Sequence, residues 1–291
     1  MDVCLIQVPF MAGDDRHGAA AGPAQLLEAG AQDLLTSMGI GVSVELVERG
    51  GPFRDTASST AAVNERLAAV VGRAVAAGQL PLVLAGSCVA CMGVLAGFDH
   101  SRCGVVWIDA HADFNTPDST VTGFFPGMSA AVITGHCYRS YWARLGDSTP
   151  IAESAVVMLG VRDLWPEAER ERLEQSEIRV IEWRDGRPEG DVQSTLEELS
   201  RRVENVYLHV DLDALDPEVA PGIVDEPVPG GLSLGQAEEA IRATSERFRI
   251  RAATLATFTP KRDLEQKTSR AALRIIELLG EHASAQFPRL V

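Results

Sequence analysis

Two short segments of the sequence carry acidic residues and a histidine at a spacing that suits metal binding. Asp109, His111 and Asp113 occupy alternate positions after one apolar run, and Asp211 and Asp213 do so after another. Alternate side chains of an extended chain lie on the same side. Because unpaired buried carboxylates are costly, a cation is a common compensation. These oxygen and nitrogen donors therefore predict a pair of divalent metals such as Mn²⁺.

Each motif also has a structural interpretation. A single Asp-x-Asp is more often part of a turn or a helix cap than a metal site, but both motifs in one chain favour the metal site. Asp216-Pro217 is predicted to fix the turn after the second apolar run. His209 is placed one residue away from the predicted ligand side, and we interpret it as a packed histidine or one that supports a ligand.

The elements that must position these residues alternate along the chain. Short apolar runs of strand type are separated by segments with helical periodicity, which predicts a parallel sheet covered by helices. Ligands of such folds bind at the carboxyl ends of the strands, where both acidic motifs fall. The strands are expected at 3–8, 43–47, 82–85, 104–109, 155–161, 178–182, 205–211 and 251–257, and the helices at 22–37, 60–77, 89–96, 166–175, 234–248 and 269–279.

Composition limits the partners and the compartment. The net charge of −15 argues against binding nucleic acid or an anionic membrane surface, and the chain has no apolar run of transmembrane length. Five cysteines without a framework spacing, and a start unlike a signal peptide, favour the reducing cytoplasm. The partner expected from these features is a small molecule.

The chain resembles the ureohydrolase superfamily of arginases, agmatinases and formiminoglutamases. The resemblance rests on the segments 109–116 and 211–217, with support from 220–222, 229–232 and the glycines near residue 20. It implies a single α/β domain over 1–291, with three layers (α/β/α) and a central parallel sheet of about eight strands. It also implies two Mn²⁺ ions per chain and a trimer or hexamer.

The resemblance assigns roles to the acidic motifs. Asp109 and Asp211 would bridge the two metals, His111 and Asp213 would complete one site, and Asp113 would serve the other. Asp113 and Asp211 are the catalytic carboxylates of this prediction, because they would hold the metals that activate water. Asn115, within the same segment, is predicted to contact substrate.

Three departures from the family pattern stand out. Cys88 occupies the place of a metal-ligating His, and its softer thiolate would favour Zn²⁺ or Fe²⁺, although burial as a small packed residue is an equal alternative. Pro126 occupies the place of a proton-shuttle His, and His136 is interpreted as structural. Thr257 replaces a Glu that pairs with the substrate guanidinium in the family, and it is kept as a substrate contact.

The loop at 222–227 carries two acids, Asp225 and Glu226, that are candidate contacts for a cationic substrate group, or else solvated charges. The function predicted from all these features is a metal-dependent hydrolase of a C–N bond in an amidine, a guanidine or a modified nitrogen compound, such as N-hydroxy-arginine or a formimino compound. The alternatives are a catalytically silent binding module or subunit, and a non-hydrolytic biosynthetic enzyme on the same scaffold.

Overall fold

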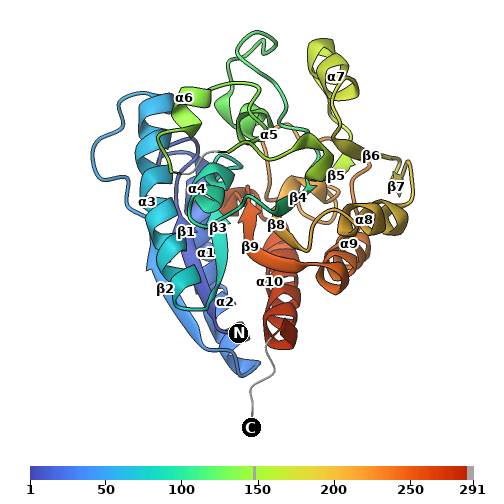
Figure 1. Ribbon diagram of the computed structural model, residues 1–291. Helices are drawn as coiled ribbons and strands as arrows, with labels where there is room; N and C mark the ends of the chain where they lie inside the picture. The colour runs from blue at the N-terminus through green and yellow to red at the C-terminus, as the bar shows by residue number, and fades with distance from the viewer. Residues whose placement is uncertain (147–148, 287–291) are drawn as a thin grey trace.

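The computed structural model describes residues 1–146 and 149–286, and it contains a nine-stranded sheet in the order β2-β1-β3-β9-β8-β4-β5-β6-β7 (Figure 1). Every pair of neighbours is parallel except β6 and β7 at one edge. The strands are β1 (Val3–Val8), β2 (Val42–Leu46), β3 (Leu80–Ala85), β4 (Cys103–Ile108), β5 (Val156–Val161), β6 (Arg179–Arg184), β7 (Arg187–Pro188), β8 (Asn205–Asp211) and β9 (Arg249–Ala256).

Helices cover both faces of the sheet and enclose two apolar cores. One core packs α1, α2, α8, α9 and α10 on the sheet, and the other packs α3, α4, α5, α6 and α7. This is the predicted three-layer α/β/α arrangement. The α-helices are α1 (Gly22–Glu28), α2 (Ala31–Ser37), α3 (Thr56–Ala76), α4 (Ala90–Ala96), α5 (Ser129–Ile133), α6 (Arg139–Trp142), α7 (Glu167–Glu174), α8 (Val192–Ser200), α9 (Leu234–Arg247) and α10 (Lys267–Gln286).

Local sequence signals explain several boundaries of these elements. The strands β3, β4 and β5 are buried along their whole length, as expected for parallel strands covered on both sides. The side chain of Asp55 caps α3, and Ser233 with Gln236 forms a capping box at the start of α9.

Some predicted elements were wrong in detail. The helix expected over 22–37 is divided into α1 and α2 at Gly30, whose φ of 100° lies in the left-handed region that a helix cannot contain. The helix α8 and the edge strand β7 were not predicted. The assignment of 1–291 to one domain stays a prediction, and residues 147–148 and 287–291 of that range lie outside the described residues.

The sheet order brings the chemically important strand ends together. The strands β3, β9, β8 and β4 are consecutive neighbours, with Ala85 beside Ala256 and Asp211 beside Ala256 in register. All four run in the same direction, so their carboxyl ends meet at one edge of the sheet. Cys88, Thr257, Asp211 and Asp109 follow or end these four strands in that spatial order.

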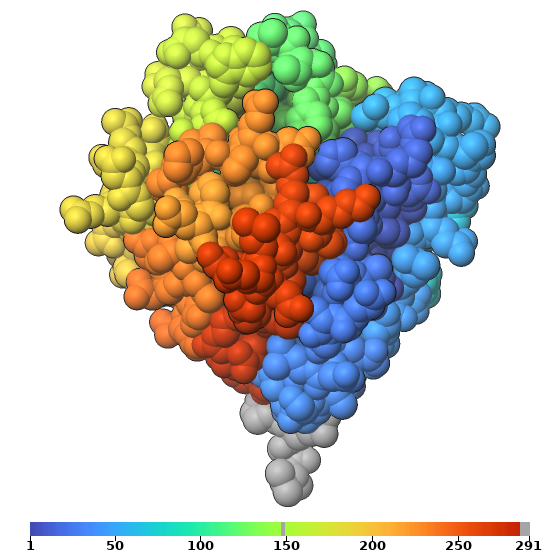
Figure 2. All heavy atoms as spheres, turned by 180° about the vertical axis from the view of Figure 1, so that it is seen from behind, coloured from blue at the N-terminus to red at the C-terminus, as the bar shows by residue number. Residues whose placement is uncertain are grey.

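The last helix, α10, covers part of the face of the molecule that is turned away from the viewer in Figure 1. In Figure 2, α10 (red) fills the space between the N-terminal segments (blue) and the segment around residues 200–250 (orange), and α10 contacts both α2 and α9.

Among the described helices, none combines the length and the apolar character needed to cross a lipid bilayer.

Candidate metal centre

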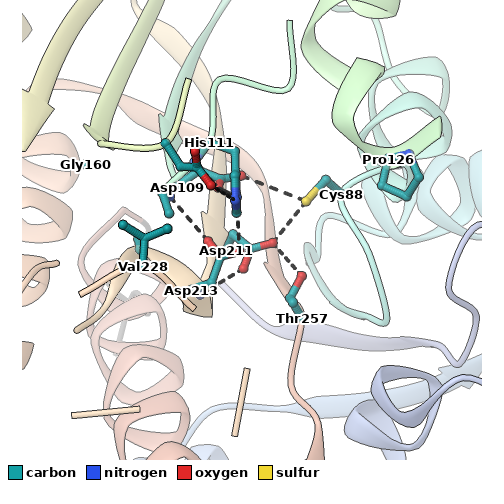
Figure 3. Close-up of polar contacts among 12 residues, drawn as sticks. Cys88, Asp109, His111, Pro126, Gly160, Asp211, Asp213, Val228 and Thr257 are labelled. Carbon is teal, nitrogen blue, oxygen red and sulfur yellow. Dashed lines mark hydrogen bonds and ion pairs between the residues drawn. The ribbon is translucent and has the colours of Figure 1, made fainter. Parts of the chain in front are cut away.

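Asp211 is the centre of the polar cluster at the strand ends. The Cys88 Sγ lies 3.0 Å from Asp211 Oδ2, and the Thr257 hydroxyl donates to the same oxygen over 2.5 Å. The other oxygen, Oδ1, accepts the backbone N–H of Asp213 at 2.9 Å. Figure 3 shows the side chains of Cys88 and Thr257 both pointing toward Asp211. The Asp211 carboxylate is thus contacted by residues that follow three strands: Cys88 after β3, Thr257 after β9 and Asp213 after β8 itself.

Asp109 is oriented in a similar way at the end of β4. Trp107 donates its indole N–H to Asp109 Oδ2 at 3.0 Å, and the backbone N–H of His111 donates to Oδ1 at 2.8 Å. The Cys88 Sγ lies 3.9 Å from Asp109 Oδ2. Both carboxylates therefore face the same thiol.

His111 lies among three carboxylates. Its Nδ1 is 3.3 Å from Asp109 Oδ1 and 3.2 Å from Asp213 Oδ2, and its Nε2 is 3.6 Å from Asp163 Oδ2. Burial alone would disfavour the charged imidazolium, but the facing carboxylates, Asp213 foremost, raise the pKa of His111 well above its usual value. For the same reason, although burial opposes it, His111 lowers the pKa of Asp213 to about 2.

Two groups of donor atoms are close enough to hold metals. Cys88, Asp109, His209 and Asp211 form the first and Asp109, His111 and Asp213 form the second, with the atoms of each group within 4.8 Å of one another. Asp109 belongs to both groups, which is what a bridging ligand requires. The predicted ligands Cys88, Asp109, His111, Asp211 and Asp213 thus lie together.

Asp113 lies in the same cavity but outside both groups of donors. Its backbone φ of 49° is left-handed, and its buried Oδ2 has no hydrogen-bond partner among the described residues. An unpartnered buried carboxylate oxygen is costly, so this atom is consistent with the metal-ligand role predicted from the sequence.

His209 was missed as a candidate ligand. The sequence interpretation placed it off the ligand side, but the two-residue spacing to Asp211 puts both side chains on one side of β8. Counting the alternation backward from Asp211 would have found it.

The electrostatics of the cluster favour a cation. Burial, followed by repulsion from Asp213 and Asp211, raises the pKa of Asp109 well above its usual value, and burial followed by repulsion from Asp109 does the same for the pKa of Asp113. Burial with repulsion from Asp213 raises the pKa of Asp211 to about 8. In the described parts of the chain, no Lys or Arg forms an ion pair with these carboxylates. The nearby Arg162 guanidinium donates instead to backbone carbonyls, including that of Asp213 at 2.8 Å.

The residues present therefore fit divalent metals. The Cys88 thiol is fully buried beside carboxylates, and burial followed by repulsion from Asp211 raises its pKa well above the usual value. In the absence of a cation the thiol keeps its proton. A cation would reverse this, because coordination deprotonates thiols and neutralises the repulsion between carboxylates.

The cluster forms one wall of a cavity of about 700 Å³. Pro126 lines this cavity, at the position where the family pattern has a proton-carrying His, and Figure 3 shows it beyond Cys88. The predicted substrate contacts Asn115, Asp225, Glu226 and Thr257 line it as well. His136 is not among the lining residues, and its Nε2 lies 2.5 Å from Glu153 Oε1.

The four predicted substrate contacts differ in how far their polar atoms are already engaged. The Asn115 amide donates to the Trp165 carbonyl at 3.2 Å, and the Thr257 hydroxyl is bonded to Asp211. Asp225 is ion-paired with Arg262 at 2.6 Å, whereas the exposed Glu226 carboxylate has no hydrogen bond or ion pair with another described residue.

Sequence reasoning missed three further ionisable residues that line the cavity, Asp163, Glu169 and His17. Glu169 accepts the backbone N–H of Phe114 at 2.9 Å, and burial raises the pKa of its carboxyl to about 7. Glu169 belongs to α7, and its separation from the acidic motifs in sequence left no signal in their spacing.

Comparison with known proteins agrees with this architecture. The model of the "Arginase family" matches residues 1–280. The arginase of Bacillus caldovelox is 32% identical over 295 residues, covering 96% of this chain and 98% of that protein. The crystal structure of arginase from Bacillus subtilis superposes with a TM-score of 0.84 at 29% identity, covering 96% and 98% of the two chains.

More distant structures share the fold alone. The agmatine ureohydrolase of Thermoplasma volcanium has a TM-score of 0.72 at 19% identity, covering 98% of this chain and 91% of that one. The match over nearly the whole length, together with the paired acidic motifs at the carboxyl ends of β4 and β8, shows that the chain belongs to the arginase family.

Proposed function

We propose that this protein is a metal-dependent hydrolase that cleaves a C–N bond of an amidine, a guanidine or a modified nitrogen compound. The observation that carries the proposal is the pair of donor groups that share Asp109 at the wall of a large cavity. Asp109 and Asp211 would bridge two divalent cations, His111 and Asp213 would serve one of them, and Cys88 and Asp113 the other. When bound, two such cations lower the pKa of water and polarise the group under attack.

The chain's own residues orient these ligands. Thr257 donates to Asp211 Oδ2 and Trp107 donates to Asp109 Oδ2, and such bonds fix the direction of a ligand. Asp163 faces the second ring nitrogen of His111, which supports the imidazole from the side away from Asp109. Preorganisation of this kind favours catalysis because little has to move during the reaction.

The cavity supports an unusual substrate in place of arginine or agmatine. Thr257 occupies the place of a guanidinium-pairing Glu, and its hydroxyl is committed to Asp211. A neutral hydroxyl cannot form the bidentate ion pair that a carboxylate makes with guanidinium. We therefore infer that the substrate is an oxidised or substituted guanidine such as N-hydroxy-arginine, or a formimino compound, with Glu226 and Asn115 as contacts for its far end.

The test is a metal-dependent assay with a panel of substrates. Protein stripped with a chelator and reloaded with Mn²⁺, Zn²⁺ or Fe²⁺ is incubated with arginine, agmatine, N-hydroxy-arginine and formimino-glutamate, and the released amine is measured by mass spectrometry. Conversion of a modified compound at a higher kcat/KM than arginine is expected, and Asp213→Asn should abolish it. Two bound metals without conversion of any compound would overturn the hydrolase assignment.

A catalytically silent role is the second candidate function. Pro126 favours it, because a proline that lines the cavity where the family pattern has a proton-carrying His cannot transfer a proton. A silent relative should bind one metal or none, and it should bind a small molecule without changing it. Elemental analysis combined with the same panel separates this function from hydrolysis.

The family resemblance also leads us to propose a homo-oligomer, a trimer or a hexamer, in the cytoplasm. Light scattering of the purified full chain measures its mass directly. A monomer at micromolar concentration would contradict the assembly, without bearing on the metal centre.

A further inference from the structure

Among the histidines of the described chain, His209 alone has a buried ring nitrogen without a hydrogen-bond partner. It is fully buried on β8, and its Nε2 has no hydrogen-bond partner among the described residues. Buried polar atoms are nearly always satisfied, so an exception requires a physical explanation. One ring nitrogen of His209 lies within 4.8 Å of donor atoms of Cys88, Asp109 and Asp211.

The hydrogen-bond network determines which nitrogen carries the proton. Tyr207 donates its hydroxyl hydrogen to Thr254 Oγ1 at 2.8 Å, so its oxygen accepts from His209 Nδ1 at 3.0 Å. With the single proton on Nδ1, the Nε2 atom has a free lone pair, the form in which imidazole binds metals.

The ring is also held in place before any metal arrives. Trp107 stacks on His209 with ring centroids 3.7 Å apart and an angle of 17° between the planes. Trp107 is itself fixed by its bond to Asp109, and it lies beside His209 in the register of β4 and β8. A metal-binding histidine commonly has this support, in which the second nitrogen donates to a fixed acceptor.

From this geometry we propose that His209, through Nε2, ligates the same metal ion as Cys88. The donor set is then one sulfur, one nitrogen and the oxygens of Asp109 and Asp211, so His209 takes the place that the sequence prediction gave to Asp113, which lies outside this group of donors. The inference rests on the metal-binding part of the proposed function, and it assigns a ligand that the family pattern does not place on this strand.

This donor set has a defined metal preference. Cysteine, histidine and carboxylate donors in a four-coordinate arrangement suit Zn²⁺, whereas an all-carboxylate and imidazole set suits Mn²⁺. The Cys88 Sγ already lies 3.0 Å from Asp211 Oδ2 and 3.9 Å from Asp109 Oδ2, so these donors face one another closely. The two positions would therefore prefer different metals. The position that contains Cys88, which follows β3, has the softer donor and would favour Zn²⁺, and it is called the softer position below.

The variant His209→Asn tests the assignment. Its amide can take the place of Nδ1 and keep the bond to Tyr207, while the atom at the place of Nε2 is lost. Stripped full-length protein is titrated with Zn²⁺ and with Co²⁺, then dialysed and analysed for metal content. Wild type should hold two ions per chain and His209→Asn one, with Zn²⁺ affinity at the softer position reduced by more than about 100-fold.

Two controls identify the cause of any loss. His282→Gln removes another buried imidazole, on α10 and far from the cluster in sequence, and should leave the metal content at two. Tyr207→Phe removes the hydroxyl that orients Nδ1, together with its bond to Thr254, and should weaken Zn²⁺ binding by about 10- to 100-fold. The Co²⁺ spectrum adds a readout apart from activity, because its thiolate charge-transfer band reports Cys88 and its d–d bands report coordination number.

Unchanged metal content, affinity and Co²⁺ spectrum in His209→Asn would overturn the proposal and leave His209 as a packed residue. If that variant does not fold, X-ray absorption of zinc-loaded wild type decides. With both His111 and His209 as ligands, two zinc ions have an average of one imidazole each, whereas with His111 alone the average is one half. Metal binding is measured without substrate, so a failure of the hydrolase assignment remains distinguishable from a failure of this ligand.

Discussion

Thr257 donates its hydroxyl hydrogen to Asp211 Oδ2 over 2.5 Å, which joins the end of β9 to the end of β8 at the centre of the polar cluster. Thr257 adopts a left-handed φ of 65°, an uncommon conformation for a β-branched residue. Its own backbone N–H donates to the carbonyl of Ala85 at the end of β3. One residue therefore couples three strand ends.

The variant Thr257→Val should weaken metal binding without unfolding the protein. Val has nearly the same shape but cannot donate to Asp211, and loss of a bond that orients a ligand costs about 10- to 100-fold in metal affinity. Calorimetric titration with Zn²⁺ and Mn²⁺ measures the change. Thr257→Ser keeps the hydroxyl and should retain affinity within about threefold, so equal losses in both variants would exclude the hydrogen bond as the cause.

Removal of metal should make stability depend steeply on pH. The folded state raises the pKa of Asp211 to about 8 from an ordinary value of 3.8, and it raises those of Asp109 and Asp113 as well. Between these values the folded state binds more protons than the unfolded state, so the free energy of unfolding falls as pH rises. The chelated protein should melt at least about 5 °C lower at pH 8 than at pH 5.5.

The control for this pH dependence is Asp211→Asn, which removes one of the titrating groups and should reduce the difference. Added Zn²⁺ should restore the melting temperature of wild type at pH 8, because the cation neutralises the carboxylates. A chelated protein that melts at the same temperature at both pH values would show that the carboxylates are not repelling one another.

Glu169, which the sequence prediction did not name as a ligand, predicts a second pH effect. Burial raises the pKa of its carboxyl to about 7 from 4.5, so wild type loses stability as pH rises through this window. Glu169→Gln keeps an acceptor for the Phe114 N–H and has no charge to bury. At pH 8 it should be more stable than wild type by up to about 3 kcal/mol, with little difference at pH 4.5.

Urea unfolding of the chelated protein at both pH values measures this difference. Glu167→Gln is the matched control, because Glu167 is exposed on the same helix and its replacement should change little at either pH. A gain for Glu169→Gln that is equal at pH 4.5 and pH 8 would mean that ionisation of the buried carboxyl is not its source.

The acidic motifs could be predicted from the sequence because two physical signals coincide there. The strands β4 and β8 are buried and mostly apolar, and acids at alternate positions stand at or just after their carboxyl ends, so strand direction and side-chain direction can both be inferred from the sequence. The same alternation pointed to His209, but it was not counted back into the apolar part of β8. For a histidine inside a buried strand, the alternate positions have to be counted in the same way as for the acids that follow the strand.

Other parts of the site depend on tertiary contacts that spacing does not encode. From the sequence, Asp225 was a candidate to contact the substrate. In the structure Arg262, 37 residues away, binds both the carboxylate and the backbone carbonyl of Asp225. Glu169 reads as one acid of a charged helix, and only the packing of α7 over the cavity buries it. The break at Gly30 was also missed, because the apolar spacing continues across it.

Cys88→His should change which metal the protein selects. The Cys88 Sγ lies 3.0 Å from Asp211 and 3.9 Å from Asp109, so an imidazole there would replace a soft donor by a borderline one at the same position. We expect Mn²⁺ to bind at least about tenfold more tightly, which is about 1.4 kcal/mol, and the native reaction to slow. Elemental analysis after competition between Mn²⁺ and Zn²⁺ measures the selectivity.

The control is Cys91→Ala, at the second cysteine of the same segment. It should leave the metal selectivity unchanged, because Cys91 is buried outside both donor groups. If Cys88→His and Cys88→Ala both keep the wild-type selectivity, the thiol is a packed side chain and the softer metal position has to be assigned to other donors.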